Sequence, residues 1–129
     1  MKPPRSLMLS VLLVAGLLAA DAQGASFQAI DSNKDGKIDL SEVKAVASRR
    51  FDQLDRKRTG TLTRAQVGRV RVNRAEFAAA DPDKDGTLSK DEYLALVEKR
   101  FTAADTDHSG TLTLQQFNSR TALPLRRLL

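Results

Sequence analysis

Residues 31–42 read DSNKDGKIDLSE, and acidic or amide side chains occupy the first, third, fifth, ninth and twelfth of these positions. A glycine stands at the sixth position and an isoleucine at the eighth. The four carboxylates of this stretch repel one another at such close spacing, although the chain of 129 residues carries a formal charge of +5. The folded loop therefore needs a positive charge inside it. The alternative is a solvated acidic turn that holds no metal.

The pattern recurs three more times along the chain, and the four segments align on their glycines. They are DSNKDGKIDLSE (31–42, loop one), DRKRTGTLTRAQ (55–66, loop two), DPDKDGTLSKDE (81–92, loop three) and DTDHSGTLTLQQ (105–116, loop four). Each segment begins with Asp and has Ile or Leu at position eight. A phenylalanine stands four residues before each of them, at Phe27, Phe51, Phe77 and Phe101. Such a repeat indicates tandem copies of one supersecondary unit.

A hard divalent cation explains the residue types at these positions. Ca²⁺ takes roughly six to eight oxygen ligands, and the side chains at positions 1, 3, 5, 9 and 12 and the carbonyl at position 7 can supply them. The pattern resembles the EF-hand superfamily, and the short linkers resemble those of small exported bacterial EF-hand (calmodulin-like) proteins. The resemblance implies an all-α fold of four tandem EF-hand helix-loop-helix units, with short shared helices and short β-bridges between paired loops.

Loops one and three have complete sets of candidate ligands. On the EF-hand resemblance, the ligands of loop one are Asp31, Asn33, Asp35, the carbonyl of Lys37, Asp39 and Glu42. Those of loop three are Asp81, Asp83, Asp85, the carbonyl of Thr87, Ser89 through a water molecule, and Glu92. The glutamate at position twelve closes the coordination sphere with two oxygens. We therefore expect two bound Ca²⁺ ions.

Loop two departs from this pattern. Positions three, five and twelve are Lys57, Thr59 and Gln66, and two arginines flank Lys57. A single carboxylate cannot offset the dehydration of a divalent ion beside three cations, so we expect no metal in loop two. One hypothesis is that Lys57 lies across the loop and replaces the charge of the ion.

Loop four is intermediate, and we expect it to be empty or to bind Ca²⁺ weakly. Its candidate ligands are Asp105, Asp107, Ser109, the carbonyl of Thr111 and Gln116. It offers two carboxylates where loops one and three offer four, and a neutral amide replaces the bidentate glutamate. His108, the single histidine of the chain, is at position four, which faces outward and ligates nothing.

The segments after loops one and three predict two continuous helices. EVKAVASRRFDQL (42–54) and YLALVEKRFTAA (93–104) contain neither glycine nor proline, and their apolar residues recur at helical spacing. Twelve helical residues span ~18 Å, whereas paired strands lie ~4.8 Å apart. Two loops joined by such a helix therefore cannot pair with each other.

The order in which the loops pair follows from this geometry. We expect loop one to pair with loop three, with Ile38 facing Leu88, and loop two to pair with loop four, with Leu62 facing Leu112. The competing arrangement breaks each linker helix and pairs loops that are neighbours in the sequence, as is usual in the family.

The first 22 residues predict a cleaved signal peptide. Lys2 and Arg5 supply a positively charged start, LMLSVLLVAGLL (7–18) an apolar run, and Ala20-Asp21-Ala22 a small-x-small cleavage pattern. The alternative is an uncleaved membrane anchor, but a spanning helix needs ~20 apolar residues. We therefore expect residues 23–129 to form a mature EF-hand domain that is exported to the periplasm or the extracellular space.

The basic residues concentrate in residues 44–74. This segment holds ten Lys or Arg against Asp52 and Asp55, which gives it a charge of +8. The simplest interpretation is a solvated face that balances the acidic loops. The alternative is a surface for an anionic lipid or polysaccharide. Nucleic acid is not expected, because no aromatic residues are interleaved with the arginines and no nucleic-acid motif is present.

Two classes of function agree with these features. The first is an exported calcium sensor or buffer, and the second is a structural or adhesive module that folds with calcium and binds an anionic envelope component through its basic face. Both methionines, Met1 and Met8, lie in the predicted signal peptide, so the mature domain lacks the flexible Met-rich surface of a promiscuous sensor. An enzyme is not expected, because there is no cysteine and no recognisable nucleophile–base pair.

Overall fold

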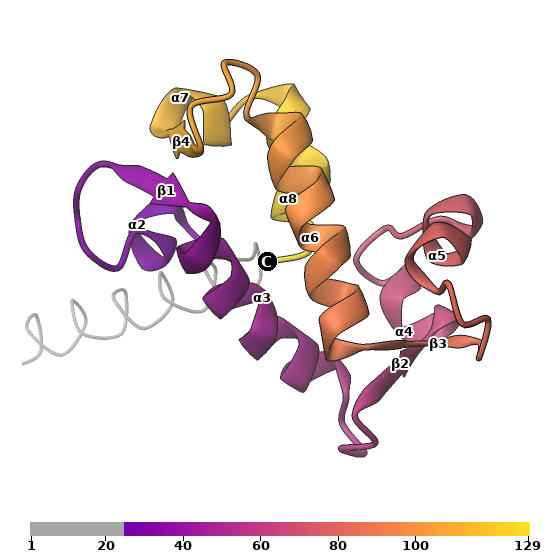
Figure 1. Cartoon of the computed structure of the whole chain (residues 1–129). Helices are drawn as coiled ribbons and strands as arrows, with labels where there is room; N and C mark the ends of the chain where they lie inside the picture. Colours follow the sequence, from indigo (N-terminus) through magenta and orange to yellow (C-terminus); the bar gives the residue numbers. More distant parts are fainter. Residues whose placement is uncertain (1–24) are drawn as a thin grey trace, which may run out of the picture.

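Two fifteen-residue helices, α3 (Leu40–Leu54) and α6 (Lys90–Ala104), form the centre of the molecule. They lie side by side and run in opposite directions in the computed structural model, which describes residues 25–129 (Figure 1). The predicted signal peptide lies outside the described residues. Within residues 25–129, no helix is long and apolar enough to cross a membrane.

Shorter elements surround this central pair. In chain order they are α2 (Phe27–Ile30), β1 (Lys37–Asp39), β2 (Thr61–Thr63), α4 (Arg64–Gly68), α5 (Arg74–Ala80), β3 (Thr87–Ser89), β4 (Thr111–Thr113), α7 (Leu114–Phe117), the 3₁₀ helix η1 (Arg120–Ala122) and α8 (Leu123–Arg126). The described part of the chain is therefore rich in helix, with two short antiparallel sheets.

The prediction of two continuous helices is confirmed. Each of them begins with a capping box. The side chain of the capping residue accepts from the backbone N–H of the glutamate at the third helical position, and the side chain of this glutamate accepts from the backbone N–H of the capping residue. The pairs are Asp39 with Glu42 in α3 and Ser89 with Glu92 in α6. The helices thus begin where loops one and three end, and each carries the next loop at its far end.

Both expected pairings of the loops are wrong. Strand β1 pairs with β4, so that loop one joins loop four with Ile38 opposite Leu112. Strand β2 pairs with β3, so that loop two joins loop three with Leu62 opposite Leu88. All four of these side chains are fully buried.

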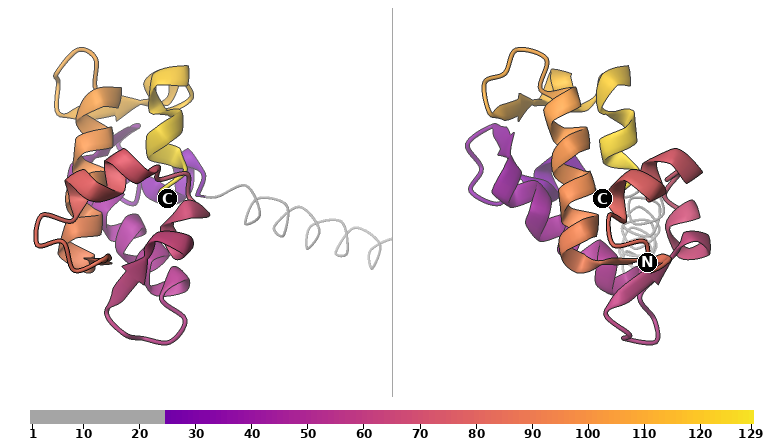
Figure 2. Two further views of the ribbon diagram at one scale, coloured as in Figure 1. Left: turned by 90° about the vertical axis from the view of Figure 1, so that its right-hand side faces the viewer. Right: turned by 45° about the vertical axis from the view of Figure 1, so that its right-hand side comes forward.

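The connection between loops two and three explains this order. Helix α4 ends at Gly68, Arg71 adopts a positive φ of 64°, and Asn73 caps a new helix, α5. The chain therefore turns back after loop two and brings loop three to the same end of the molecule (Figure 2). Helix α6 then returns in the opposite direction to α3 and places loop four beside loop one. The pairing prediction failed because pairing loop one with loop three requires the connection between loops two and three to cross the molecule, as α3 and α6 do, whereas this connection turns back.

The C-terminal residues pack into the core beside α6. Leu125 and Leu128 are fully buried, and the Tyr93 hydroxyl donates a hydrogen bond to the Leu128 carbonyl at 2.9 Å. The guanidinium of Arg100, only 7% exposed, donates to the carbonyls of Pro124 and Arg71 and to Glu76. The last turn of the chain therefore closes the apolar interior.

Candidate metal-binding loops

All four loops adopt the same backbone turn. The residue at position six is a glycine with φ between 80° and 84° in every loop, a conformation that glycine adopts without strain. The residue at position four also has a positive φ, between 53° and 57°. These four residues are Lys34, Arg58, Lys84 and His108. Sequence reasoning predicted the glycine but not the left-handed residue two positions earlier.

Loop one gathers three carboxylates around one point. One oxygen each of Asp31, Asp35 and Glu42 lies within 4.8 Å of the others. Asp31 is buried, and its Oδ2 accepts from the backbone N–H of Gly36 at 3.0 Å. This bond holds the first carboxylate against the turn. Glu42 lies at the start of α3, which carries it back towards Asp31.

Two further candidate ligands of loop one have other roles in the structure. Asn33 Oδ1 accepts from the backbone N–H of Asp35 at 3.3 Å. Asp39 lies outside the carboxylate group, because its Oδ1 caps α3 and accepts from Glu42 N at 2.9 Å and from the Ser41 hydroxyl at 2.7 Å. The bond from the Glu42 backbone N–H and a second from the Ser41 hydroxyl lower the pKa of Asp39.

Loop three brings four carboxylates together. Oxygens of Asp81, Asp83, Asp85 and Glu92 all lie within 4.8 Å of one another. A hydrogen bond with Asp81, together with burial and the neighbouring Asp85, raises the pKa of Asp83 to about 6. The crowded anions thus compete with one another for a proton. A divalent cation in their midst would remove this competition.

The remaining candidates of loop three are arranged as in loop one. Ser89 Oγ caps α6 by accepting from Glu92 N at 3.2 Å, and Glu92 Oε1 accepts from Ser89 N at 2.8 Å. Thr87 N donates to Asp85 Oδ1 at 2.9 Å. In both loops position nine is therefore also the helix cap. The Ser-x-x-Glu spacing of residues 89–92 is a capping signature, which sequence reasoning overlooked while assigning ligands.

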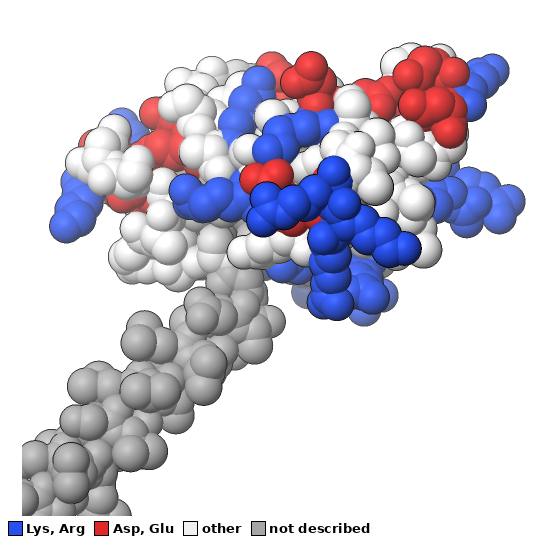
Figure 3. All heavy atoms as spheres, turned by 90° about the horizontal axis from the view of Figure 1, so that it is seen from below, with Lys and Arg blue, Asp and Glu red and all other residues white. Residues whose placement is uncertain are grey.

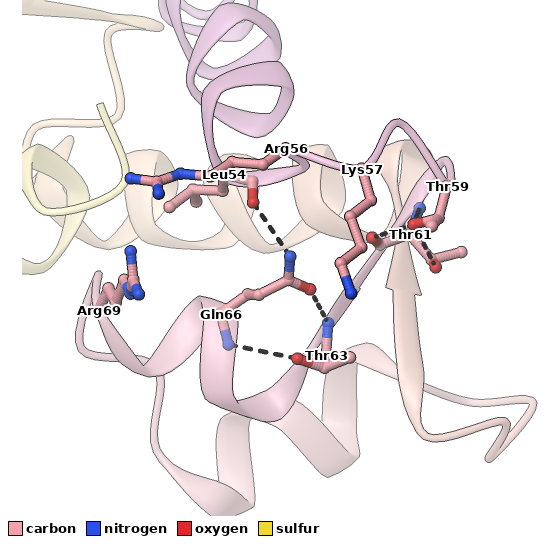
Figure 4. Close-up of a pocket in the computed structure, with 8 residues that line it drawn as sticks. All are labelled: Leu54, Arg56, Lys57, Thr59, Thr61, Thr63, Gln66 and Arg69. Carbon is pink, nitrogen blue, oxygen red and sulfur yellow. Dashed lines mark hydrogen bonds between the residues drawn. The ribbon is translucent and has the colours of Figure 1, made fainter.

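Loop two keeps the turn with a single carboxylate, that of Asp55. Asp55 Oδ1 accepts from the backbone N–H of Thr59 at 2.9 Å, and its Oδ2 accepts from that of Gly60 at 2.8 Å. Gln66 Nε2 donates to the Leu54 carbonyl at 3.0 Å and so ties the end of the loop to its beginning (Figure 4). These hydrogen bonds within the chain hold loop two closed without an ion.

The Lys57 side chain points across loop two towards Thr63 and Gln66 (Figure 4). This is the direction that the hypothesis of a built-in cation requires. Gln66 Oε1 accepts instead from the backbone N–H of Thr63 at 2.7 Å. The position-twelve side chain of loop two is therefore already used in a capping box.

Loop four has a smaller set of oxygens. Asp105 is buried, and its Oδ2 accepts from the backbone N–H of Gly110 at 2.8 Å. Hydrogen bonds with Asp105 and Ser109 lower the pKa of Asp107 to about 2, which keeps this carboxylate charged. Gln116 Oε1 accepts from Thr113 N at 2.9 Å. Two carboxylates are present, too few to form a group like those of loops one and three.

The donor chemistry of loops one and three fits a hard divalent cation. Their convergent atoms are carboxylate oxygens, with an amide and a hydroxyl nearby and no nitrogen or sulfur donors, which is the environment that Ca²⁺ prefers. Strand pairing joins each of them to an incomplete loop, namely loop one to loop four and loop three to loop two.

Two family models match this chain. A model of the EF hand matches residues 24–47, which include α2, loop one and the first half of α3. A model of the EF-hand domain pair matches residues 74–100, which include α5, loop three and most of α6. No curated protein matches the sequence. EF-hand domains in general bind Ca²⁺, and on these two matches residues 24–47 and 74–100 belong to the EF-hand superfamily.

Proposed function

We propose that this chain is an exported calcium-binding protein, a Ca²⁺ sensor or buffer, which holds one ion in loop one and one in loop three. The observation that carries the proposal is the convergence of acidic oxygens within 4.8 Å in these two loops. Like charges at this spacing destabilise the folded loop unless a cation lies among them. All four loops then count as EF-hand units, two of which bind metal.

Each candidate ligand has a defined role in this proposal. Asp31 and Asp81 begin the loops and are fixed by the turn, while Glu42 and Glu92 approach from the exiting helices. Asn33, Asp35, Asp83 and Asp85 supply the remaining side-chain oxygens, and Lys37 and Thr87 supply backbone carbonyls. Asp39 and Ser89 ligate through water while they cap α3 and α6. The Ca²⁺ ion supplies the positive charge that these residues lack.

The distinction between sensor and buffer depends on exposed apolar surface. Within residues 25–129, Leu114 is the one large apolar residue that is exposed. A buffer would keep the core closed when Ca²⁺ binds, whereas a sensor would open it. Fluorescence of an apolar dye with and without Ca²⁺ separates the two roles. The calcium level of the periplasm or the extracellular space can be high, and there affinities of ~10⁻⁴–10⁻³ M suffice.

A calorimetric Ca²⁺ titration of metal-stripped residues 23–129 tests the proposal. We expect two ions per chain, one ion for Glu42→Gln and for Glu92→Gln, and none for the double variant. Glu98→Gln is the matched control, because Glu98 lies on the surface of α6 and contacts Lys44 instead of a loop. An absence of heat and of any change in circular dichroism up to several millimolar Ca²⁺ would refute the calcium proposal.

A second candidate function is favoured by the distribution of charge. Lys and Arg side chains gather across the face of the molecule that is seen from below in Figure 3. Loop two and the end of α3 lie at this lower end (Figure 1). We propose that this face, from residues 44–74, binds an anionic lipid or polysaccharide of the envelope. Salt-sensitive binding to anionic vesicles or polysaccharide would favour it, and a calcium response without such binding would favour the sensor or buffer.

A further inference from the structure

A pocket of about 420 Å³ opens beside loop two. It is lined by Leu54, Arg56, Lys57, Thr59, Thr61, Thr63, Gln66 and Arg69. Three of these residues are cations and none is an acid. The pocket of loop two corresponds in position to the centre of the carboxylate groups in loops one and three. The side chains around those centres are negatively charged, whereas the side chains around this pocket are positively charged.

The cations of this pocket have no acidic partner in the described residues. The ion pairs within residues 25–129 join Lys44 to Glu98, Lys90 to Asp52 and Arg100 to Glu76. The Asp55 carboxylate accepts from the backbone of loop two itself. Among residues 25–129, Arg56, Lys57 and Arg69 therefore have no acidic side chain within ion-pair distance.

Two of these cations face each other. In Figure 4 the guanidinium groups of Arg56 and Arg69 point toward one another across the pocket, beside Leu54. Lys57 lies on the opposite side of the pocket, next to Thr63 and Gln66. Two guanidinium groups that converge in this way repel each other, and an anion placed between them removes the repulsion.

We propose that Arg56 and Arg69 clamp a tetrahedral oxyanion of the phosphate class. A guanidinium presents a planar fork of N–H donors that matches two oxygens of a phosphate at once. The Thr59 hydroxyl donates to Asp55 within loop two, whereas the Thr63 hydroxyl accepts from Gln66 N and keeps its own hydrogen for a further oxygen of the ligand. Lys57 adds long-range attraction. Loop two has thus exchanged a cation site for an anion site on an unchanged turn.

This proposal deepens the second candidate function, because it names a site and a ligand group on the basic face. It does not depend on calcium binding. The phosphoryl group can belong to a phospholipid headgroup or to free phosphate, and both offer the same tetrahedral oxygens. A diffuse attraction to the basic face would need no particular arginine. The clamp therefore predicts that only substitutions of Arg56 and Arg69 reduce binding, whereas diffuse attraction predicts that any two arginines contribute alike.

Nuclear magnetic resonance titration of ¹⁵N-labelled residues 23–129 tests the clamp. Inorganic phosphate is added in calcium-free buffer, with chloride at equal ionic strength as the reference. The titration is repeated with sulfate in the presence of Ca²⁺, so that the fold with loaded loops is also examined. We expect saturable shifts confined to the amides of residues 55–69 and to the arginine side chains, in both states.

Two double variants with the same change in charge provide the control. Arg56→Gln/Arg69→Gln removes the clamp, whereas Arg74→Gln/Arg127→Gln removes two exposed arginines that do not line the pocket. All four arginines are exposed, and circular dichroism checks that both variants fold. We expect the first variant to weaken phosphate binding on the order of tenfold or more, because each lost charge-assisted contact carries a large share of the affinity. The second should change it less than twofold.

Vesicles identify the source of the phosphoryl group. Binding to phosphatidylglycerol vesicles that is lost in the clamp variant, and is competed by free phosphate, assigns a lipid headgroup. Saturable phosphate binding without this pattern supports the clamp with free phosphate as its ligand. Shifts that do not saturate, that chloride reproduces, or that both variants reduce equally would overturn the proposal, and none of these results bears on the calcium titration.

Discussion

The buried guanidinium of Arg100 makes the stability of this fold depend on a single carboxylate. Glu76 Oε2 accepts from Arg100 Nη2 at 2.8 Å and from its Nε at 3.1 Å. The side chain of Arg100 is 7% exposed and that of Glu76 is 31% exposed. Glu76→Gln removes the negative charge but keeps an oxygen acceptor and a residue type that suits the third position of α5.

The cost of this substitution can be worked from the two hydrogen bonds. Each bond now joins a cation to a carboxylate, and the variant would join the same cation to a neutral amide oxygen. If each bond loses about half of the ~1.5–3 kcal/mol that a hydrogen bond to a charged group contributes, the two together cost roughly 2–3 kcal/mol. The partial exposure of Glu76 screens its charge and brings the figure to about 2 kcal/mol. For a domain of this size ~1 kcal/mol shifts the Tm by ~4 °C. We therefore expect Glu76→Gln to lower the Tm by roughly 8 °C.

Thermal unfolding followed by circular dichroism measures this shift, in chelator and in excess Ca²⁺. Glu98→Gln is the matched control, because it breaks the pair with Lys44 in which the side chains are 38% and 51% exposed. Such a surface pair contributes ~0–1 kcal/mol, so the control should lower the Tm by at most ~4 °C. Equal shifts for the two variants would refute the reasoning, since Arg100 would then be held by its two carbonyl acceptors alone.

Three further predictions concern loop four, the buried tyrosine and the β1–β4 pairing. Gln116→Glu adds a third carboxylate to loop four and should create a third binding event in calcium calorimetry. Burial raises the pKa of Tyr93, the single tyrosine, above its ordinary 10.0. Above pH 10 the tyrosine of the unfolded chain ionises while the buried one stays neutral, so the free energy of unfolding is unaffected below pH 10 and falls as the pH rises further. Phenolate absorbance should therefore appear only with unfolding. The β1–β4 pairing predicts that Lys37→Cys with Thr113→Cys forms a disulfide, whereas Lys37→Cys with Ser89→Cys, as loop pairing one–three would require, does not.

The helices and loops of this protein could be predicted because their determinants are local. The four loops share one register of Asp, Gly and an aliphatic residue, and the turn depends on positions within each twelve-residue segment. The two long helices follow from apolar residues at helical spacing without glycine or proline. Both signals act over a few residues, and the tertiary contacts of this fold do not override the local conformations that they favour.

The pairing of the loops was not predicted, although its signals are also present in the sequence. Gly68 ends α4, and Asn73 with Glu76 forms the capping box that begins α5. These residues break the connection between loops two and three, whereas the other two connections have no such break. The prediction overlooked this break and so placed loops two and three at opposite ends of the molecule. The packing of α6 against α3 then fixes loop four beside loop one.

The position of the C-terminal segment could not be derived from local patterns. Its leucines stand on both sides of two adjacent arginines, Arg126 and Arg127, which is compatible with a solvated basic tail. In the structure Leu125 and Leu128 are fully buried, and the Tyr93 hydroxyl binds the carbonyl of Leu128. This outcome depends on the packing of η1 and α8 against α6, which exists only in the assembled fold and leaves no signal within the segment itself.

The arrangement of the loops has a consequence for how calcium would bind. Loops one and three lie at opposite ends of the antiparallel pair α3 and α6, and a fifteen-residue helix spans ~22 Å. This separation is more than twice the Debye length of ~8 Å at physiological salt, so the electrostatic interaction between the two ions is largely screened. Each complete loop is also paired with a partner that is closed by its own hydrogen bonds, such as those of Asp55 and Gln66. The two ions should therefore bind independently, and Glu42→Gln should leave the affinity of loop three within about twofold. A large loss at loop three would mean that α3 transmits the occupancy of loop one along its length.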